Sequence, residues 1–248
     1  EEFEEIYGDF GYNEAISRDK NSLSYLSTPS KNIWLLMLDT NKYENNMSIG
    51  FPQIHGCISH ETLKWIEECS NLAKEKNAQI IAIMHHSLLN HSQVLKEGFI
   101  LDNAKETLKV FENCGINLVL TGHIHIQDIK YHENNNKTIY DIATSSLAVY
   151  PHHYGVLTYS PSYGYDYNTN AVDVENWSKE VNIKDKNINN FREYSQNFFK
   201  NHFSSMFYDI LIQTGKFKDR QAKFISKTLA SLNLKYFAGT GFKIVDKI

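Results

Sequence analysis

Residues 80–86 read IIAIMHH, and residues 117–125 read NLVLTGHIH. Each stretch opens with a short, continuous apolar run, which is typical of a strand buried on both faces of a sheet. Ile33–Leu38, IWLLML, is a third run of this kind. The three runs predict buried strands, and two of these strands end in histidine.

Helices are predicted between the buried strands. His60–Lys76 carries its apolar residues on one face, and Ser59 before it is a suitable N-cap. Asn103–Asn113 is followed by Gly115, a residue type that often closes a helix. Strand and helix therefore alternate with short connections, and this order predicts a partly parallel α/β sheet.

Shorter segments complete the first part of the chain. Ile126–Tyr131 and Thr138–Ala143 flank the turn-forming sequence HENNNK and predict a β-hairpin. Val156–Tyr159 predicts one more strand. Ser160–Asn170, SPSYGYDYNTN, is rich in Ser, Gly, Asn and Tyr, and it predicts a linker or an ordered connecting loop.

The last part of the chain is predicted to be a small helical bundle with an aromatic core, a reading favoured over a ligand cage. Charge supports a division into two units: residues 1–178 carry 12 basic and 23 acidic side chains, whereas residues 179–248 carry 13 and 6. Two stripes at helical spacing are expected to face the core: Ile188, Phe191, Ser195 and Phe198, and then Phe224, Thr228 and Leu232.

Composition excludes several classes of protein. The chain has 248 residues, 42% of them hydrophobic and 22% charged, as in a folded globular protein. No apolar run reaches the ~20 residues of a membrane span, and a net charge of −4 argues against non-specific nucleic-acid binding. Three cysteines without CxxC spacing exclude a disulfide framework and a cysteine zinc site: Cys57, Cys69 and Cys114.

The strand-end histidines predict a metal site. Ligands collect at the carboxyl ends of parallel strands, where His85, His86 and Gly122–His125 stand. In an extended backbone His123 and His125 point the same way, and Gly122 permits a sharp turn beside them. Neutral imidazole is a common ligand of Zn, Fe, Mn, Co and Ni. A single such histidine is usually only a hydrogen-bonded polar residue, but two motifs in one α/β unit favour metal binding.

The pair of motifs, an apolar strand with MHHS and an apolar strand with GHIH, resembles the last two signatures of the calcineurin-like metallophosphoesterases. The resemblance implies an α/β fold, part of a four-layer α/β/β/α sandwich followed by a small helical domain. It further implies phosphodiester hydrolysis by a dinuclear metal centre. Residues 1–167 would be the C-terminal portion of the catalytic domain. Residues 168–248 resemble the C-terminal domain of bacterial cyclic-nucleotide phosphodiesterase-like members.

The resemblance also implies a role for each histidine. His85 and His123 would share one metal, and His125 would bind the other. His86 and His91 would face the substrate or support the ligands. The cofactors would be two divalent or mixed-valence transition metal ions, drawn from Fe, Mn, Zn, Co or Ni, and the substrate a phosphoester, with nucleotides or cyclic nucleotides as candidates.

Three upstream signatures of that family are absent from the sequence: Asp-x-His, a Gly-Asp followed by Gly-Asn-His, and Gly-Asn-His itself. We therefore expect the chain to be a fragment that lacks the N-terminal ligands, binds metal weakly and turns over little substrate alone. Its uncovered sheet predicts self-association or a partner that carries the N-terminal half of the same protein. The alternative is a non-catalytic, degenerate sandwich that binds a ligand or partner.

Overall fold

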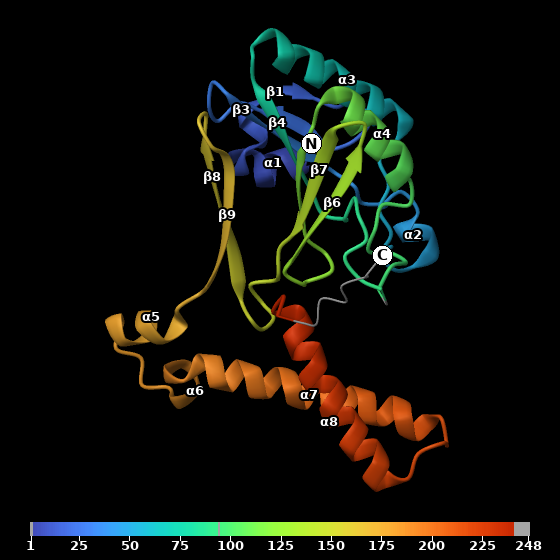
Figure 1. The fold of residues 1–248 in the computed structure, drawn as a ribbon, viewed down its shortest axis with the longest axis vertical. Coiled ribbons are helices and arrows are strands. Elements are labelled where there is room, and N and C mark those ends of the chain that lie inside the picture. Colours follow the sequence, from blue (N-terminus) through green and yellow to red (C-terminus); the bar gives the residue numbers. More distant parts are fainter. Residues whose placement is uncertain (1, 94, 241–248) are drawn as a thin grey trace. The chain divides into compact units, whose positions relative to one another are not determined.

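The computed structural model describes residues 2–93 and 95–240 (Figure 1). The chain forms two compact units. Unit 1 comprises residues up to Ile124 together with Asp128–Ala143, and unit 2 comprises His125–Gln127 together with residues from Thr144 onward. The sequence predicts that residues 1–167 belong to a catalytic domain and residues 168–248 to a C-terminal domain. This functional boundary stays a prediction.

Unit 1 is built on one mixed sheet of seven strands in the order β1-β2-β3-β4-β5-β7-β6. Strands β3, β4, β5 and β7 run parallel, and the outer pairs are antiparallel. The predicted α/β class and partly parallel sheet are confirmed. The strands are β1 (Ala15–Arg18), β2 (Tyr25–Ser27), β3 (Ile33–Leu38), β4 (Gln79–Met84), β5 (Leu118–Thr121), β6 (Asp128–Asn134) and β7 (Lys137–Ala143).

The two long helices of unit 1 are α3 (His60–Glu75) and α4 (Ala104–Cys114), and both were predicted within one or two residues. The Ser59 side chain accepts a hydrogen bond from the Thr62 amide, which satisfies one free donor of the first turn. Gly115 closes α4 with a φ of 76°. Shorter pieces are α1 (Glu2–Tyr7), η1 (Gly8–Phe10), η2 (Tyr12–Glu14) and α2 (Asn46–Ile49).

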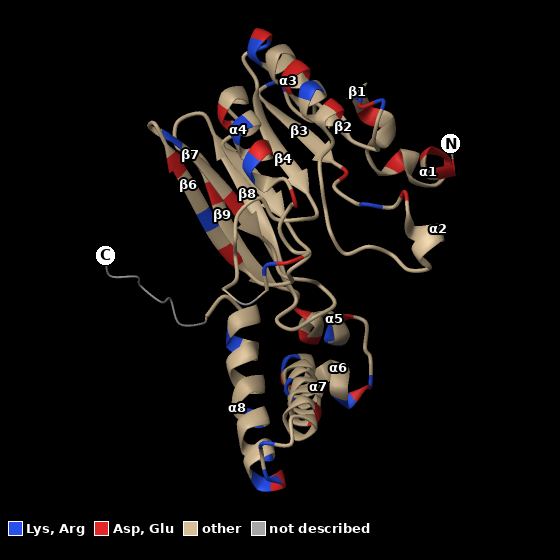
Figure 2. Cartoon of the chain, turned by 90° about the vertical axis from the view of Figure 1, so that its right-hand side faces the viewer, with Lys and Arg blue, Asp and Glu red and all other residues tan. Residues whose placement is uncertain are grey.

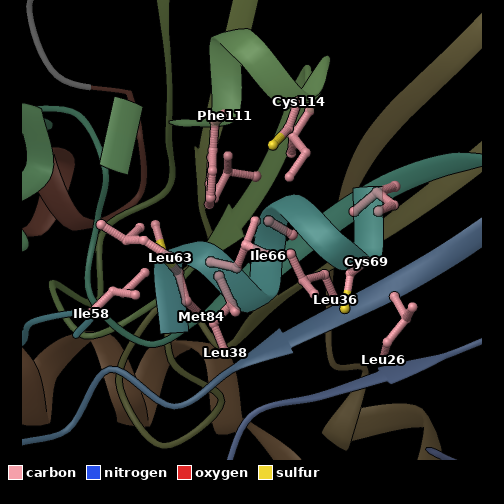
Figure 3. Close-up of a cluster of buried hydrophobic side chains, with 14 of the residues drawn as sticks. Leu26, Leu36, Leu38, Ile58, Leu63, Ile66, Cys69, Met84, Phe111 and Cys114 are labelled. Atoms are coloured by element: carbon pink, nitrogen blue, oxygen red, sulfur yellow. The ribbon is translucent and has the colours of Figure 1, made fainter. Parts of the chain in front are cut away.

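The core of unit 1 lies between the sheet and these two helices. Ile66 and Phe111 are fully buried, and they belong to one apolar cluster with Leu36 and Val119 of the sheet (Figure 3). This packing holds the parallel strands in register, so β4 and β5 end side by side. The hairpin of β6 and β7 turns at Asn135–Asn136, both at positive φ, as predicted for the asparagine run.

Unit 2 contains a two-stranded sheet of β8 (His153–Ser160) and β9 (Gly164–Ala171). The prediction of a linker or loop over Ser160–Asn170 is therefore wrong, because most of that segment pairs antiparallel with β8. Every residue of β9 is exposed or only partly buried, so the strand shows no apolar alternation in sequence. The strand predicted at Val156–Tyr159 is confirmed within β8.

Four helices follow: α5 (Val174–Glu180), α6 (Lys186–Asn189), α7 (Phe191–Gln213) and α8 (Asp219–Phe237). Helical structure is confirmed, but the predicted core faces are only partly correct. Ser195 is buried as expected, whereas the predicted stripe of α8 (Phe224, Thr228 and Leu232) is exposed. Phe198 is 64% exposed and Phe224 is 73% exposed, whereas the buried Phe199 packs on Phe203 and Phe237. The start of α8 carries both signs of charge, with Lys223 3.0 Å from Asp219 (Figure 2). No helix in the described ranges is long and apolar enough to cross a membrane.

Candidate metal-binding site

The site lies where β4 and β5 end next to each other in the sheet. His85 follows β4 directly, and His123 lies two residues beyond β5. The Gly122 amide donates to the His85 carbonyl at 3.1 Å, which continues the parallel pairing past the last paired residues. Nε2 of His85 lies 2.9 Å from Nδ1 of His123. The structure thus brings these two predicted ligands together.

The hydrogen bonds of His123 indicate which of its ring nitrogens carries the proton. Its Nε2 lies 3.1 Å from the carbonyl oxygen of Gly98. A carbonyl only accepts, so Nε2 carries a proton, and in the neutral tautomer Nδ1 is the acceptor in the contact with His85 Nε2. A metal ligand is commonly oriented in this way, by a backbone acceptor on its other nitrogen.

The backbone at the GHIH motif is not extended. His123 and His125 have φ values of 62° and 57°. The expectation that they point the same way assumed an extended backbone, and this assumption is wrong. Gly122 is not among the residues at positive φ. The sharp turn is therefore made by the histidines themselves. Non-glycine residues in this region cost energy, and they cluster at functional sites.

His86 faces inward, away from solvent. It is 2% exposed, its Nε2 donates to the Ile54 carbonyl at 3.0 Å, and its Nδ1 accepts from the Thr40 hydroxyl at 2.7 Å. Burial lowers the pKa of His86 to about 4, further helped by the neighbouring His85 and His123. The ring therefore stays neutral at physiological pH, with its centroid 4.7 Å from that of His123.

His91 is enclosed between two aspartates. Its Nδ1 lies 3.0 Å from Asp128 Oδ2 and its Nε2 lies 3.2 Å from Asp141 Oδ2, and its side chain has no exposed surface. Burial alone would lower the pKa of His91, but the two carboxylates outweigh it and raise the pKa to about 9. The ring is therefore an imidazolium at neutral pH. In this position the ring pairs with the two carboxylates and does not contact solvent. A role of His91 in the reaction stays a prediction.

His125 is exposed and belongs to unit 2, whereas His85 and His123 belong to unit 1. Within residues 2–93 and 95–240, no group of three or more His, Cys, Asp or Glu side chains is arranged to hold a metal ion. The described part of the chain thus supplies two converging nitrogens and not a full coordination sphere. A dinuclear centre does not fit these residues alone.

Sequence reasoning missed the groups that hold the histidines. Thr40 and Gly98 belong to loops whose sequence carries no sign of their contacts. Asp141 did leave a signal, because it interrupts the apolar strand KTIYDIA, and a buried carboxylate requires partners. Asp128 follows GHIH closely, but its pairing with His91 depends on the fold.

Comparison with known proteins adds an independent line of evidence. Residues 173–248 match the family model for the C-terminal domain of cyclic nucleotide phosphodiesterase. The predicted resemblance of the tail to such a domain is confirmed, whereas the bacterial link stays a prediction.

Among solved structures, the chain is similar to a dimetal phosphatase from Danio rerio, with a TM-score of 0.47 and 12% identity. The alignment covers 66% of this chain and 66% of that one, so the chain spans just under two thirds of that structure. No curated protein matches the chain in sequence.

Proposed function

We propose that this chain forms part of a metal-dependent phosphodiesterase and carries part of its dinuclear metal centre. The observation that carries the proposal is the 2.9 Å separation of His85 Nε2 and His123 Nδ1 at the ends of adjacent parallel strands. Two nitrogens about 2.1 Å from one tetrahedral ion stand roughly 3.4 Å apart, so a small movement of the two rings, with loss of the proton between them, would place both nitrogens on one ion. The match of residues 173–248 supports the same reading.

In this proposal His85 and His123 bind one divalent ion and His125 the other. Such a centre, if completed by further ligands, would supply polarisation of a phosphoryl group and activation of water. The proton of His123 stays on Nε2, which donates to the Gly98 carbonyl, so Nδ1 is the nitrogen that would bind the ion. In the metal-free chain His85 Nε2 carries the proton of its hydrogen bond to His123 Nδ1, and binding an ion would require that proton to leave Nε2, with the other ring nitrogen, Nδ1, protonated instead. The neutral His86 adds no positive charge beside the cation, because its pKa is lowered to about 4.

The remaining ligands lie outside the residues described here. A site with few ligands binds metal weakly, because affinity depends steeply on the number of ligands and their charge. We therefore infer that the 248-residue chain alone binds metal weakly and hydrolyses little substrate. The full activity requires carboxylates from further sequence of the same protein or from a second chain. The proposed substrate is a phosphodiester, with nucleotides or cyclic nucleotides as the leading class.

The test is hydrolysis of bis-p-nitrophenyl phosphate in the presence of Mn²⁺, Zn²⁺ or Co²⁺. The 248-residue chain is expected to show little turnover, and the complete gene product is expected to show strong turnover that His123→Ala abolishes. His202→Ala, which removes an exposed imidazole on α7, is the matched control. A complete gene product that binds these metals nowhere and shows no turnover would overturn the proposal.

The second candidate function is a non-catalytic binding module. It is favoured by the lack of a three-ligand group among the described residues. The same assay separates the two candidates, because a binding module remains inactive with every metal whatever sequence accompanies it.

A further inference from the structure

Asp141, in the middle of β7, has a carboxylate with no exposed surface and four partners. Its Oδ2 accepts from the amides of Leu88 and Leu89 at 2.8 and 2.7 Å. The same oxygen lies 3.2 Å from Nε2 of His91. Its Oδ1 accepts from the Thr121 hydroxyl at 2.7 Å. Both oxygens are thus engaged by separate parts of the chain.

These partners flank the two candidate ligands of unit 1. Leu88 and Leu89 follow His85 in the loop that leaves β4. Thr121 is the last residue of β5 and stands two residues before His123. One carboxylate, projecting from a third parallel strand, therefore connects the segments that carry both imidazoles. A shift of either segment would break hydrogen bonds that have no water to replace them.

Charge strengthens this connection. A carboxylate without surface exposure is costly unless it is paired, and His91 supplies the positive partner. His91 is held from its other side by Asp128 of β6, and Lys130 lies 3.4 Å from Asp128 Oδ2. The contact of His91 Nδ1 with Asp128 is a charge-assisted hydrogen bond, which is stronger than a neutral one, and Asp141 lies at ion-pair distance from Nε2. The cluster joins the loop after β4 to both strands of the hairpin.

We propose that Asp141 is a positioning residue that sets the separation of His85 and His123 by holding the ends of β4 and β5. The effect of Asp141 on catalysis rests on the proposed function. Its effect on the separation of the two histidine rings does not. Asp141 touches neither candidate ligand, so it acts through the backbone of the loop after β4 and through Thr121.

The test compares the 248-residue wild type with Asp141→Asn in two measurements. In metal-free protein, the rings of His85 and His123 have centroids 4.6 Å apart, so NMR should show a nuclear Overhauser effect between their ring protons. Asp141→Asn should lose this effect while keeping the far-UV circular dichroism of the wild type. In a Co²⁺ titration, the variant should bind at least about tenfold more weakly, as expected when the support of a ligand is removed.

Two further variants complete the design. Asp166→Asn removes an exposed carboxylate on β9, so it should leave both measurements unchanged. Thr121→Val removes only the bond at Oδ1 and keeps the pairing with His91, so it should weaken the ring contact in the same direction by a smaller amount. If Asp141→Asn does not fold, Thr121→Val decides the question.

The outcomes separate this inference from the proposed function. A wild type that shows the ring contact but binds no Co²⁺ even at the highest concentration of the titration, where weak binding would still be detected, counts against the proposed function. The positioning role is then judged on the ring contact alone. A folded Asp141→Asn with the ring contact and the Co²⁺ affinity of the wild type overturns the positioning role. So does a Thr121→Val variant identical to the wild type when Asp141→Asn fails to fold.

Discussion

Gly56 lies so close to the imidazole of His86 that a Cβ on Gly56 would stand 2.2 Å from the ring Nδ1. The same ring is fixed by the Thr40 hydroxyl and by the carbonyl of Ile54, two residues before Gly56. The segment that contains Ile54 and Gly56, together with Thr40, therefore packs closely around the ring. Only a residue without a side chain fits opposite it.

Gly56→Ala should lower the free energy of unfolding by about 1–3 kcal/mol, the usual effect of adding a group to a filled interior. The measurement is urea unfolding followed by tryptophan fluorescence. Gly122→Ala is the matched control, because its Cβ would come no closer than 3.9 Å to His85. Equal stability of Gly56→Ala and the wild type would show that the ring has room to move.

His91 should make the stability of unit 1 depend on alkaline pH. Its pKa is raised to about 9 in the folded chain, against about 6.5 when unfolded. The stabilisation is therefore complete below pH 6.5 and is lost as the pH rises through 9. At about 1.4 kcal/mol per pKa unit, the loss is on the order of 3 kcal/mol. Urea unfolding between pH 6 and 10 measures this loss. In His91→Gln the free energy of unfolding should change less over the same pH range. A wild-type curve without that slope would contradict the ion pairs with Asp128 and Asp141.

The bundle of unit 2 should depend on Phe199 rather than on Phe198. Phe199 is 4% exposed and contacts three other rings, so Phe199→Ala should destabilise unit 2 by about 3–5 kcal/mol. Phe198→Ala, at the next position and mostly exposed, should change stability by less than about 0.5 kcal/mol. Thermal melting followed by circular dichroism at 222 nm compares the two. A larger loss of stability for Phe198→Ala than for Phe199→Ala would support the core face predicted from sequence, which contains Phe198.

The three thiols should differ in reactivity. Burial raises the pKa of Cys69 to about 12 and also raises that of Cys114, and both side chains are nearly inaccessible. Burial raises the pKa of Cys57 as well, but this residue is only partly buried. Iodoacetamide at pH 8 should therefore modify Cys57 first, and peptide mass spectrometry reads the order. Faster labelling of Cys69 would mean that α3 opens readily.

Much of the fold of unit 1 could be predicted because its buried strands are continuous apolar runs. Ile33–Leu38 was placed with both ends correct, and Gly115 fixed the end of α4. The strand β9 was missed because its residues are mostly solvent-facing and of turn-forming types. The core face of α7 was predicted only in part, with Ser195 buried and Phe198 exposed, because aromatic and aliphatic residues occur all around that helix. Periodicity therefore does not select one side.

The candidate site could be predicted only in part. Strand ends in a parallel sheet meet at one edge, so the approach of His85 and His123 follows from the order of elements. The positive φ of His123 and His125 does not follow from it, because only the tertiary structure imposes that conformation. The support from Asp141 likewise depends on contacts between residues 20 to 53 positions apart, which no local pattern contains.

The most direct test of the account is the position of a bound cation. Crystals of the 248-residue chain soaked in Zn²⁺ at high concentration should give an anomalous difference peak about 2.1 Å from both His85 Nε2 and His123 Nδ1. The peak should vanish in His123→Ala and persist in His202→Ala. A map with no peak at this pair, while zinc occupies other histidines of the same crystal, would contradict the proposal that these two residues are metal ligands.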